Sequence, residues 1–228
     1  CSPARASFFT SRYGSELGIL DFIPQPGHRE HTAATGEIGI AARLVTFPEV
    51  LAAAGYVNGL FGKWHLGDWT RASDRRFHPT KHGFHVFMGL TGGGTRPVDP
   101  SLEVNGQERE FKGLTDDILT DHAIGFIEEP RAQPFLMVLA LRAPHTAWLP
   151  VAPEDLAPHE RYDPDIPNPD YPDLDVARVK RMTREYAASV SGVDRNVGRV
   201  LAALDRLKLA ENTVVIFTSD NGYFYGEH

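Results

Sequence analysis

The chain has 228 residues, of which 42% are hydrophobic and 23% are charged, and its formal net charge is −7. This length can bury a substantial core in one domain, and the composition is ordinary for a globular protein. The acidic balance and the lack of a long Lys/Arg run exclude a typical nucleic-acid-binding surface. No apolar run approaches the roughly 20 residues of a membrane span, and a single cysteine excludes an internal disulfide.

The first predicted element is a helix that begins within residues 1–5, which read CSPAR. Pro3 suits the first helical position because its missing N–H costs nothing there, and Ser2 suits the N-cap. Arg5 falls in the first turn, where it places a fixed cation beside the Cys1 side chain. Free N–H groups and the positive end of the helix dipole attract an oxyanion. The segment therefore fits a nucleophile on a helix N-terminus, or simply a capped helix with a surface arginine.

Three further features are predicted in the first hundred residues. Residues 14–43 contain glycines and histidines without clear periodicity, which indicates a loop. Residues 46–49, Thr-Phe-Pro-Glu, form a capping box that opens a short helix ending at Gly55. A short strand is predicted over residues 56–61. Residues 83–95 contain several glycines and aromatic residues with no clear period.

The second half of the chain alternates helices with apolar strands. A helix is predicted over residues 116–129, followed by a strand covered on both faces over residues 135–141. Residues 149–172 are rich in proline and acids and predict an irregular surface excursion. A long amphipathic helix over residues 176–207 and a buried strand over residues 212–219 complete the chain. We therefore predict the α/β class, with a largely parallel central sheet flanked by helices.

Polar side chains follow three of the predicted strands. Lys63 and His65 follow the first in the motif GKWHLG, His145 follows the second in APHT, and Asp220 and Asn221 follow the third in SDNG. Because open α/β sheets place ligands beyond the carboxyl ends of their strands, we expect these groups to share one edge of the sheet.

These residue types suit the binding of a small anion and a hard cation. Lys63 and His65 are two residues apart and share a face of extended backbone, so both can meet the same anion. Asp220 and Asn221 offer two oxygen ligands of the kind that Ca²⁺ or Mg²⁺ prefers. The plainer alternatives are a solvated lysine with a hydrogen-bonded histidine, a structural His145, and an Asx turn at the Asp-Asn pair.

A lone cysteine among such groups also suggests a thiolate hydrolase with His65 or His145 as base. That chemistry needs neither an additional lysine nor a hard-cation site, and this chain carries residues for both. Zinc is a poor fit, because Asp-Asn is a harder ligand set than zinc prefers and the chain has no Cys-x-x-Cys pair.

Taken together, these segments resemble the type I sulfatases of the alkaline-phosphatase superfamily. Residues 1–5 resemble the family's Cys-x-Pro-x-Arg signature, and residues 62–67 resemble its second signature. Residues 143–146 and 219–222 match two further family blocks in the same order, and residues 193–199 resemble the helix that precedes the last block. The resemblance covers nearly the whole chain and implies the alkaline-phosphatase-like sulfatase fold.

The resemblance implies a sulfuric ester hydrolase in which a formylglycine-generating system oxidises Cys1 to formylglycine. One hydroxyl of the aldehyde hydrate would attack sulfur and expel the alcohol, which leaves a covalent sulfate ester. Loss of a proton from the other hydroxyl would then release sulfate and restore the aldehyde. By the same resemblance, Arg5 would orient these hydroxyls and Lys63 would link them to the sulfate. His65 would be the base, and His145 would contact sulfate and help to protonate the leaving oxygen.

The resemblance also implies a divalent cation, usually Ca²⁺ with Mg²⁺ as an alternative, bound by Cys1, Asp220 and Asn221 and acting as a Lewis acid. The family's paired aspartates, a later lysine and a C-terminal subdomain are not found in this sequence. We therefore expect residues 1–228 to be part of a catalytic domain, truncated at both ends and inactive alone. Many family members are periplasmic, secreted or lysosomal.

Two other functions remain open at this point. Formylglycine and the same anion site can serve a phosphate or phosphonate monoester hydrolase, and a non-catalytic relative could hold a sulfated glycan without cleaving it. The expected partner is a sulfated small molecule or glycan, with aryl, sugar and alkyl sulfates all open. Residues 83–100 and 149–172 are candidate specificity elements, and the sequence does not specify an oligomeric state.

Overall fold

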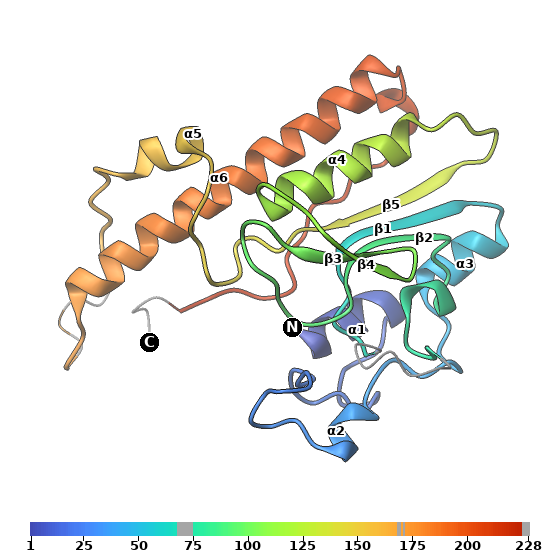
Figure 1. Ribbon diagram of the computed structural model, residues 1–228, viewed down its shortest axis with the longest axis horizontal. Coiled ribbons are helices and arrows are strands. Elements are labelled where there is room, and N and C mark those ends of the chain that lie inside the picture. The colour runs from blue at the N-terminus through green and yellow to red at the C-terminus, as the bar shows by residue number, and fades with distance from the viewer. Residues whose placement is uncertain (68–74, 168–169, 171, 225–228) are drawn as a thin grey trace.

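A five-stranded mixed sheet forms the centre of the protein (Figure 1). The computed structural model describes residues 1–67, 75–167, 170 and 172–224. The strands are β1 (Val57–Lys63), β2 (Val86–Leu90), β3 (Ser101–Val104), β4 (Gln107–Glu110) and β5 (Phe135–Ala140), in the order β4-β3-β2-β1-β5. β1 pairs in parallel with β2 and β5, whereas β3 is antiparallel to both β2 and β4. The predicted α/β class is confirmed, with an antiparallel hairpin added to the parallel strands.

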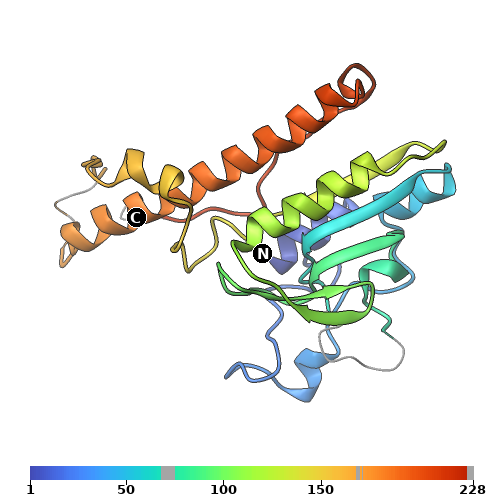
Figure 2. The ribbon, with the colours of Figure 1, turned by 45° about the horizontal axis from the view of Figure 1, so that its top comes forward.

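Helices cover both faces of this sheet (Figure 2). They are α1 (Ser2–Thr10), α2 (Ala33–Gly36), α3 (Phe47–Ala53), α4 (Thr115–Glu128), α5 (Pro153–Leu156) and α6 (Val176–Arg206). Short 3-10 helices occur at Pro79–Lys81, Ala157–His159 and Ala210–Asn212. α1 and α3 lie on one face of the sheet, while α4 packs against the other face and α6 packs on α4. No helix in the described ranges is both long and apolar enough to cross a membrane.

Alternation along β1 divides the apolar core between these two layers. Leu60 points into a cluster with Phe9 of α1 and Trp64, and the next residue, Phe61, points into a cluster with Phe126 of α4. Leu60 and Trp64 are fully buried. Because successive strand residues face opposite ways, one central strand anchors both helical layers and fixes where its carboxyl end lies.

The N-caps of α3 and α1 show where local sequence signals predict the backbone conformation correctly and where they do not. Thr46 and Glu49 form the predicted capping box of α3: the Thr46 hydroxyl accepts the Glu49 N–H at 3.4 Å, and the Glu49 carboxylate accepts the Thr46 N–H at 2.8 Å. The N-cap predicted at Ser2 is wrong by one residue, since α1 is capped at Cys1. The Ser2 hydroxyl is instead buried and accepts the Ile23 N–H at 3.1 Å, so a long-range contact uses the group that the local rule assigned to capping.

Three strands escaped the sequence analysis. β2 lies inside the aperiodic segment 83–95, and four of its five residues are buried, so no alternation of polar and apolar residues marks it. β3 and β4 form a hairpin whose turn is Asn105–Gly106, with φ values of 47° and 91°. An Asn-Gly pair of this conformation is a strong hairpin signal. The hairpin was therefore readable from the sequence, whereas β2 was not.

The predicted buried strand over residues 212–219 is wrong. A 3-10 helix covers Ala210–Asn212, and the segment that follows is extended but pairs with no described strand. Val214 is 88% exposed and Ile216 is 79% exposed. The apolar, β-branched composition correctly indicates extended backbone, but a strand also needs a hydrogen-bonding neighbour, which composition does not specify. β5, predicted to be covered on both faces, is half-buried along its length because it forms an edge of the described sheet.

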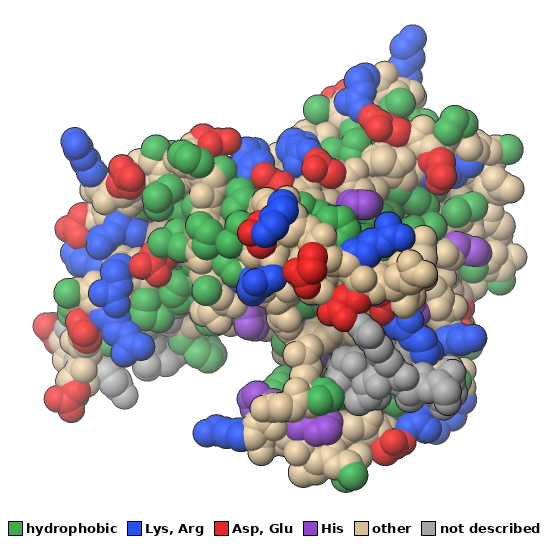
Figure 3. Space-filling model, viewed as in Figure 1, with side chains coloured by type: hydrophobic (Ala, Val, Ile, Leu, Met, Phe, Trp, Pro, Cys, Tyr) green, Lys and Arg blue, Asp and Glu red, His purple; other side chains and the backbone are tan. Residues whose placement is uncertain are grey.

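The remaining predictions for the second half are confirmed. α4 and α6 match the predicted helices within two residues at each end, and α6 carries its apolar stripe toward α4. The predicted excursion after β5 is irregular apart from α5 and one 3-10 turn, with residues 168, 169 and 171 outside the described part. Lys, Arg, Asp and Glu side chains are interspersed on the face shown in Figure 3.

Candidate active site

Three of the predicted site residues meet where β1 ends. The Lys63 Nζ donates to the Cys1 Sγ at 3.2 Å, and the His65 Nδ1 lies 3.3 Å from the same sulfur. Cys1 is contributed by the N-cap of α1, whereas Lys63 is the last residue of β1 and His65 follows two residues later. Lys63 is 6% exposed and His65 is 3% exposed. The cysteine side chain therefore lies between a cation and an imidazole in a largely water-excluded setting.

Glycines make room for this arrangement. Gly62 precedes Lys63 with a φ of 118°, and a Cβ there would collide with the Ala140 carbonyl of β5. Gly93, in the loop after β2, faces the histidine of the same motif: a Cβ on Gly93 would come within 2.7 Å of the His65 ring. Sequence analysis noted that the 83–95 segment is glycine-rich but did not assign Gly93 to the site. The contact depends on β2, which no sequence signal marked.

His65 is held in one tautomer by its second ring nitrogen. The Nε2 lies 3.0 Å from the carbonyl oxygen of Ile23. A carbonyl can only accept, so Nε2 carries the hydrogen and, in the neutral ring, Nδ1 presents its lone pair to Cys1. Burial and the neighbouring Lys63 charge lower the pKa of His65 to about 3, which keeps the ring neutral. His65 is thus set up to accept a proton from a group carried on the Cys1 Cβ.

Lys63 and Arg5 supply positive charge to the same place. Burial, followed by the nearby Arg5 charge, lowers the pKa of Lys63 to about 8. The Arg5 Nε donates to the Trp64 carbonyl at 2.8 Å, and a second guanidinium nitrogen donates to the Lys63 carbonyl. Arg5 also lies 3.6 Å from the Asp220 carboxylate. Arg5 therefore ties the first turn of α1 to the end of β1, and its guanidinium contacts the Lys63 and Trp64 carbonyls and Asp220.

His145 and Asn221 do not join this cluster. His145 is exposed, and its Nδ1 lies 2.8 Å from the Thr146 carbonyl oxygen. The Asn221 amide donates to the Gly222 carbonyl at 3.4 Å. The loop of His145 nevertheless lies near the segment after Asp220, because the Thr146 N–H donates to the Tyr223 hydroxyl at 3.4 Å. Lys63, His65 and Asp220 thus lie at one edge of the sheet, as expected. For His145 and Asn221 only the backbone segments lie near one another, and the two side chains point elsewhere.

The described residues do not complete a site for a hard cation. Within the described ranges, no three His, Cys, Asp or Glu side chains lie close enough together to hold a metal ion. Asp220 is paired with Arg5, and Cys1 lies beside Lys63, so positive charge already surrounds these two expected ligands. Ca²⁺ takes about six to eight oxygen ligands. Asp220 and Asn221 are suitable donors but are too few to complete such a shell.

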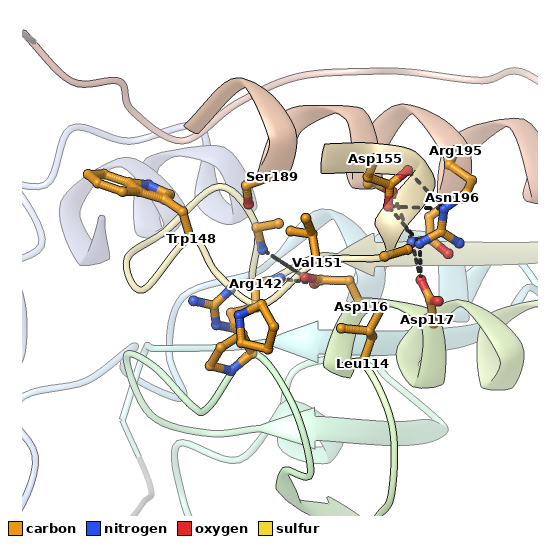
Figure 4. Close-up of a pocket in the computed structure, with 15 residues that line it drawn as sticks. Leu114, Asp116, Asp117, Arg142, Trp148, Val151, Asp155, Ser189, Arg195 and Asn196 are labelled. Carbon is orange, nitrogen blue, oxygen red and sulfur yellow. Dashed lines mark hydrogen bonds and ion pairs between the residues drawn. The ribbon is translucent and has the colours of Figure 1, made fainter. Parts of the chain in front are cut away.

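A second polar region that sequence analysis did not identify adjoins the His145 loop. A pocket there is lined by Asp116, Asp117, Arg142, Asp155 and Arg195, among others (Figure 4). In sequence these residues look like ordinary surface charges on helices and after a strand. Only the fold reveals that they face one another.

Comparison with known proteins agrees with this architecture. A family model described as Sulfatase matches residues 1–228. The "Uncharacterized sulfatase YdeN" of Escherichia coli is 30% identical over 96% of this chain and 38% of its own length. N-acetylgalactosamine-6-sulfatase of Canis lupus familiaris is 30% identical over 97% of this chain and 41% of its own length. The chain thus spans about two fifths of these relatives.

Solved structures give the same result. The putative sulfatase yidJ from Bacteroides fragilis superposes with a TM-score of 0.84 at 24% identity, covering 99% of this chain and 52% of that one. Ps i-CgsB in complex with k-i-k-neocarrahexaose superposes with a TM-score of 0.71 at 26% identity, covering 92% of this chain and 45% of that one. The first of these likenesses shows the fold alone.

Proposed function

Because the chain belongs to the sulfatase family, we propose that the protein hydrolyses a sulfate monoester at a site built around Cys1. The observation that carries the proposal is the position of the Cys1 Sγ, 3.2 Å from the Lys63 Nζ and 3.3 Å from the His65 Nδ1. A cation and a neutral proton acceptor on either side of one side chain suit a nucleophile that reacts with an anionic ester.

We further propose that Cys1 acts as formylglycine, as the Cys-x-Pro-x-Arg spacing of residues 1–5 suggests. This group, when present, supplies a hydrated aldehyde whose hydroxyl serves as the nucleophile and whose return to the aldehyde releases sulfate. The surroundings of Cys1 fit it, since a hydroxyl at the position of the Sγ lies within hydrogen-bond reach of both Lys63 and His65. A formylglycine-generating system is the partner that this proposal requires.

The charge and position of each side chain around Cys1 suit it to a different role. Lys63 stabilises negative charge that develops on the sulfate in the transition state. His65 accepts a proton at Nδ1, the nitrogen that the Ile23 carbonyl leaves unprotonated. A bound sulfate next to the ring raises its proton affinity, because a nearby negative charge favours the imidazolium form. Arg5 holds the first turn of α1 against the end of β1 and so keeps Cys1 in reach of both groups. His145 contacts the sulfate and protonates the leaving oxygen.

A divalent cation, Ca²⁺ or Mg²⁺, completes the proposal with Cys1, Asp220 and Asn221 as its expected ligands. When bound, it would supply Lewis-acid polarisation. Treatment of the purified enzyme with a chelator should abolish turnover, and addition of Ca²⁺ should restore it. Full activity after exhaustive chelation, with no residual metal by elemental analysis, would contradict this part of the proposal.

The substrate class is proposed only as sulfate esters of sugars or other small alcohols. Relatives of similar identity are named for different substrates, including the N-acetylgalactosamine-6-sulfatase above and a steryl-sulfatase of Rattus norvegicus that is 27% identical over 97% of this chain and 47% of its own length. These names share the sulfate group and differ in the alcohol, so the proposal is limited to the sulfate ester itself.

The direct test compares 4-nitrophenyl sulfate with 4-nitrophenyl phosphate, using the full-length enzyme and its Cys1→Ala variant. We expect kcat/KM to favour the sulfate at least 10²-fold and to fall to background in the variant. A preference for the phosphate would establish a phosphate monoester hydrolase instead. Binding of sulfated ligands without turnover of either ester would establish the non-catalytic alternative.

A further inference from the structure

Arg142 is a buried cation that the proposed reaction does not use. It is the second residue after β5 and is 4% exposed. Its Nε donates to the Thr95 carbonyl at 3.0 Å, and its Nη2 donates to the His145 carbonyl at 2.9 Å and also to the Ala147 carbonyl. The His145 N–H in turn donates to the Arg142 carbonyl at 3.0 Å. The Arg142 guanidinium thus holds the backbone after the His145 side chain, and the Arg142 main-chain carbonyl holds the backbone before it.

Asp116, in the first turn of α4, holds the start of the same loop. Its carboxylate accepts the Arg142 N–H at 2.6 Å and the Ala143 N–H at 3.2 Å (Figure 4). Desolvation raises the pKa of Asp116, and the two backbone hydrogen bonds and the Arg142 charge oppose that rise. The partly buried Asp116 carboxylate and the buried Arg142 guanidinium therefore attract each other while each binds loop backbone.

Arg142 also connects this loop to the one that contacts His65. Its partner Thr95 belongs to the segment that follows β2. The same segment contains Gly93, which faces the His65 ring, and Thr91, whose carbonyl accepts the His65 N–H at 2.9 Å. A chain of direct contacts therefore runs from His65 through residues 91–95 to Arg142, and from Arg142 to both sides of His145.

We propose that Arg142 and Asp116 are positioning residues that fix the location of His145 relative to His65 and Cys1. The proposal rests on the proposed function, in which His145 protonates the leaving oxygen. Arg142 holds the loop by its guanidinium and Asp116 by its carboxylate. A lysine at position 142 carries all its donors on one nitrogen, so it cannot span from the Thr95 carbonyl to the His145 and Ala147 carbonyls as the Nε and Nη2 of Arg142 do.

The consequence concerns the leaving group more than sulfate binding. An acid that protonates the departing oxygen matters most when that oxygen is a poor leaving group. Displacing His145 should therefore slow hydrolysis of phenyl sulfate more than that of 4-nitrophenyl sulfate, whose phenolate leaves readily. A merely structural role for Arg142 would slow both substrates by the same factor.

The experiment is a double-mutant cycle of Arg142→Gln with His145→Ala in the full-length enzyme, measured on both substrates. We expect Arg142→Gln alone to lower kcat for phenyl sulfate about 10²-fold and for 4-nitrophenyl sulfate about 10-fold or less, with KM nearly unchanged. In the His145→Ala background, Arg142→Gln should lower kcat by less than about 3-fold further, because the imidazole that Arg142 positions is already absent. The kcat of Arg142→Lys for phenyl sulfate should lie between those of the parent enzyme and Arg142→Gln. Asp116→Asn should show the same pattern as Arg142→Gln with smaller losses.

Arg195→Gln is the matched control. Arg195 lines the same pocket and pairs with Asp117 and Asp155 at 2.9 Å each, but its described contacts do not include the His145 loop (Figure 4). Arg195→Gln should lower kcat for both substrates by the same factor, and its loss should multiply with that of His145→Ala. If Arg142→Gln does not fold, as judged by thermal unfolding, the same cycle with Asp116→Asn decides the question.

The outcomes separate the two proposals. The positioning role alone would be overturned if the kcat losses of Arg142→Gln and His145→Ala multiply and the ratio of rates on the two substrates stays unchanged. Absence of sulfate turnover in the unaltered enzyme would overturn the proposed function and this assignment with it. Non-additive losses confined to the poorer leaving group would support both.

Discussion

The His65 Nδ1 and the Cys1 Sγ lie 3.3 Å apart although 64 residues separate them in the chain. This contact exists because α1 begins at Cys1 directly beneath the end of β1, and Arg5 hydrogen-bonds to the carbonyls of Lys63 and Trp64. The Ile23 carbonyl then selects the tautomer of His65. A nucleophile position and its proton acceptor are thus assembled from a helix start, a strand end and one loop carbonyl.

Lys63→Met should lower kcat for an aryl sulfate by roughly 10²-fold, because it removes a buried cation that faces the Cys1 side chain and keeps the length of the side chain. Steady-state kinetics on the full-length variant checks this. Lys81→Met, at an exposed lysine of the same domain, is the control and should retain full activity. Equal rates for Lys63→Met and the parent enzyme would return Lys63 to a structural role.

Gly93→Ala should impair the enzyme by pressing on His65. The new methyl group would lie within 2.7 Å of a ring that the Ile23 carbonyl holds in place, so the imidazole or the loop must shift. Overpacking of this kind typically costs about 1–3 kcal/mol. We expect kcat to fall by at least about 10-fold. Gly94→Ala is the neighbouring control: nothing lies within 4 Å of its Cβ, and its activity should be unchanged. Similar activity in the two variants would refute the tight contact.

The sequence predicted the neighbours of Cys1 from local signals. The Cys-x-Pro-x-Arg and GKWHLG segments begin a helix and end a strand, and the structure brings Cys1, Lys63 and His65 together as expected, while their catalytic roles stay predictions. Gly93 was not identified in advance, because β2 is too short and too buried to show a period. Arg142 and Asp116 were not, because two side chains from a helix start and a strand end that bind the same loop backbone have no signature within either segment.

The same distinction explains the failed strand. Residues 213–219 have the composition of a buried strand and are extended, but Val214 and Ile216 are largely exposed. Propensity determines backbone conformation residue by residue, whereas burial and pairing depend on which other strands present an edge. The α/β class was therefore predictable from the alternation of helices and strands, and the β3–β4 hairpin from its Asn105-Gly106 turn. The lack of a pairing partner for residues 213–219 required the tertiary structure.

Glu103 should make stability depend on pH at the acidic end. Burial opposes its ionisation, but hydrogen bonds from His78 and Arg75 outweigh that effect and lower the pKa of Glu103 to about 2. The ordinary value is 4.5. The folded-state pKa is depressed, so the ionised Glu103 contributes its full stability above about pH 4.5, and this contribution is lost as pH falls toward 2.

Urea unfolding of the parent and of Glu103→Gln at several pH values between 6 and 2.5 measures this contribution. The difference in the free energy of unfolding should be largest at pH 6, up to about 3 kcal/mol, and should shrink steadily below pH 4.5. Glu110→Gln is the control, since Glu110 of β4 forms an exposed pair with Arg96 of the loop between β2 and β3 and should show little difference at any pH. A difference for Glu103→Gln that stays constant down to pH 2.5 would contradict the assignment.

The measurement that tests the central claim most directly is mass spectrometry of the peptide containing Cys1, made on full-length preparations that differ in specific activity. Preparations from hosts with and without a formylglycine-generating system provide that range. The claim predicts an aldehyde at Cys1 and aryl-sulfatase activity that rises in proportion to the aldehyde fraction. Activity carried by preparations that contain only the unmodified thiol would contradict it and would assign the chemistry to a Cys1 thiolate with His65 as its base.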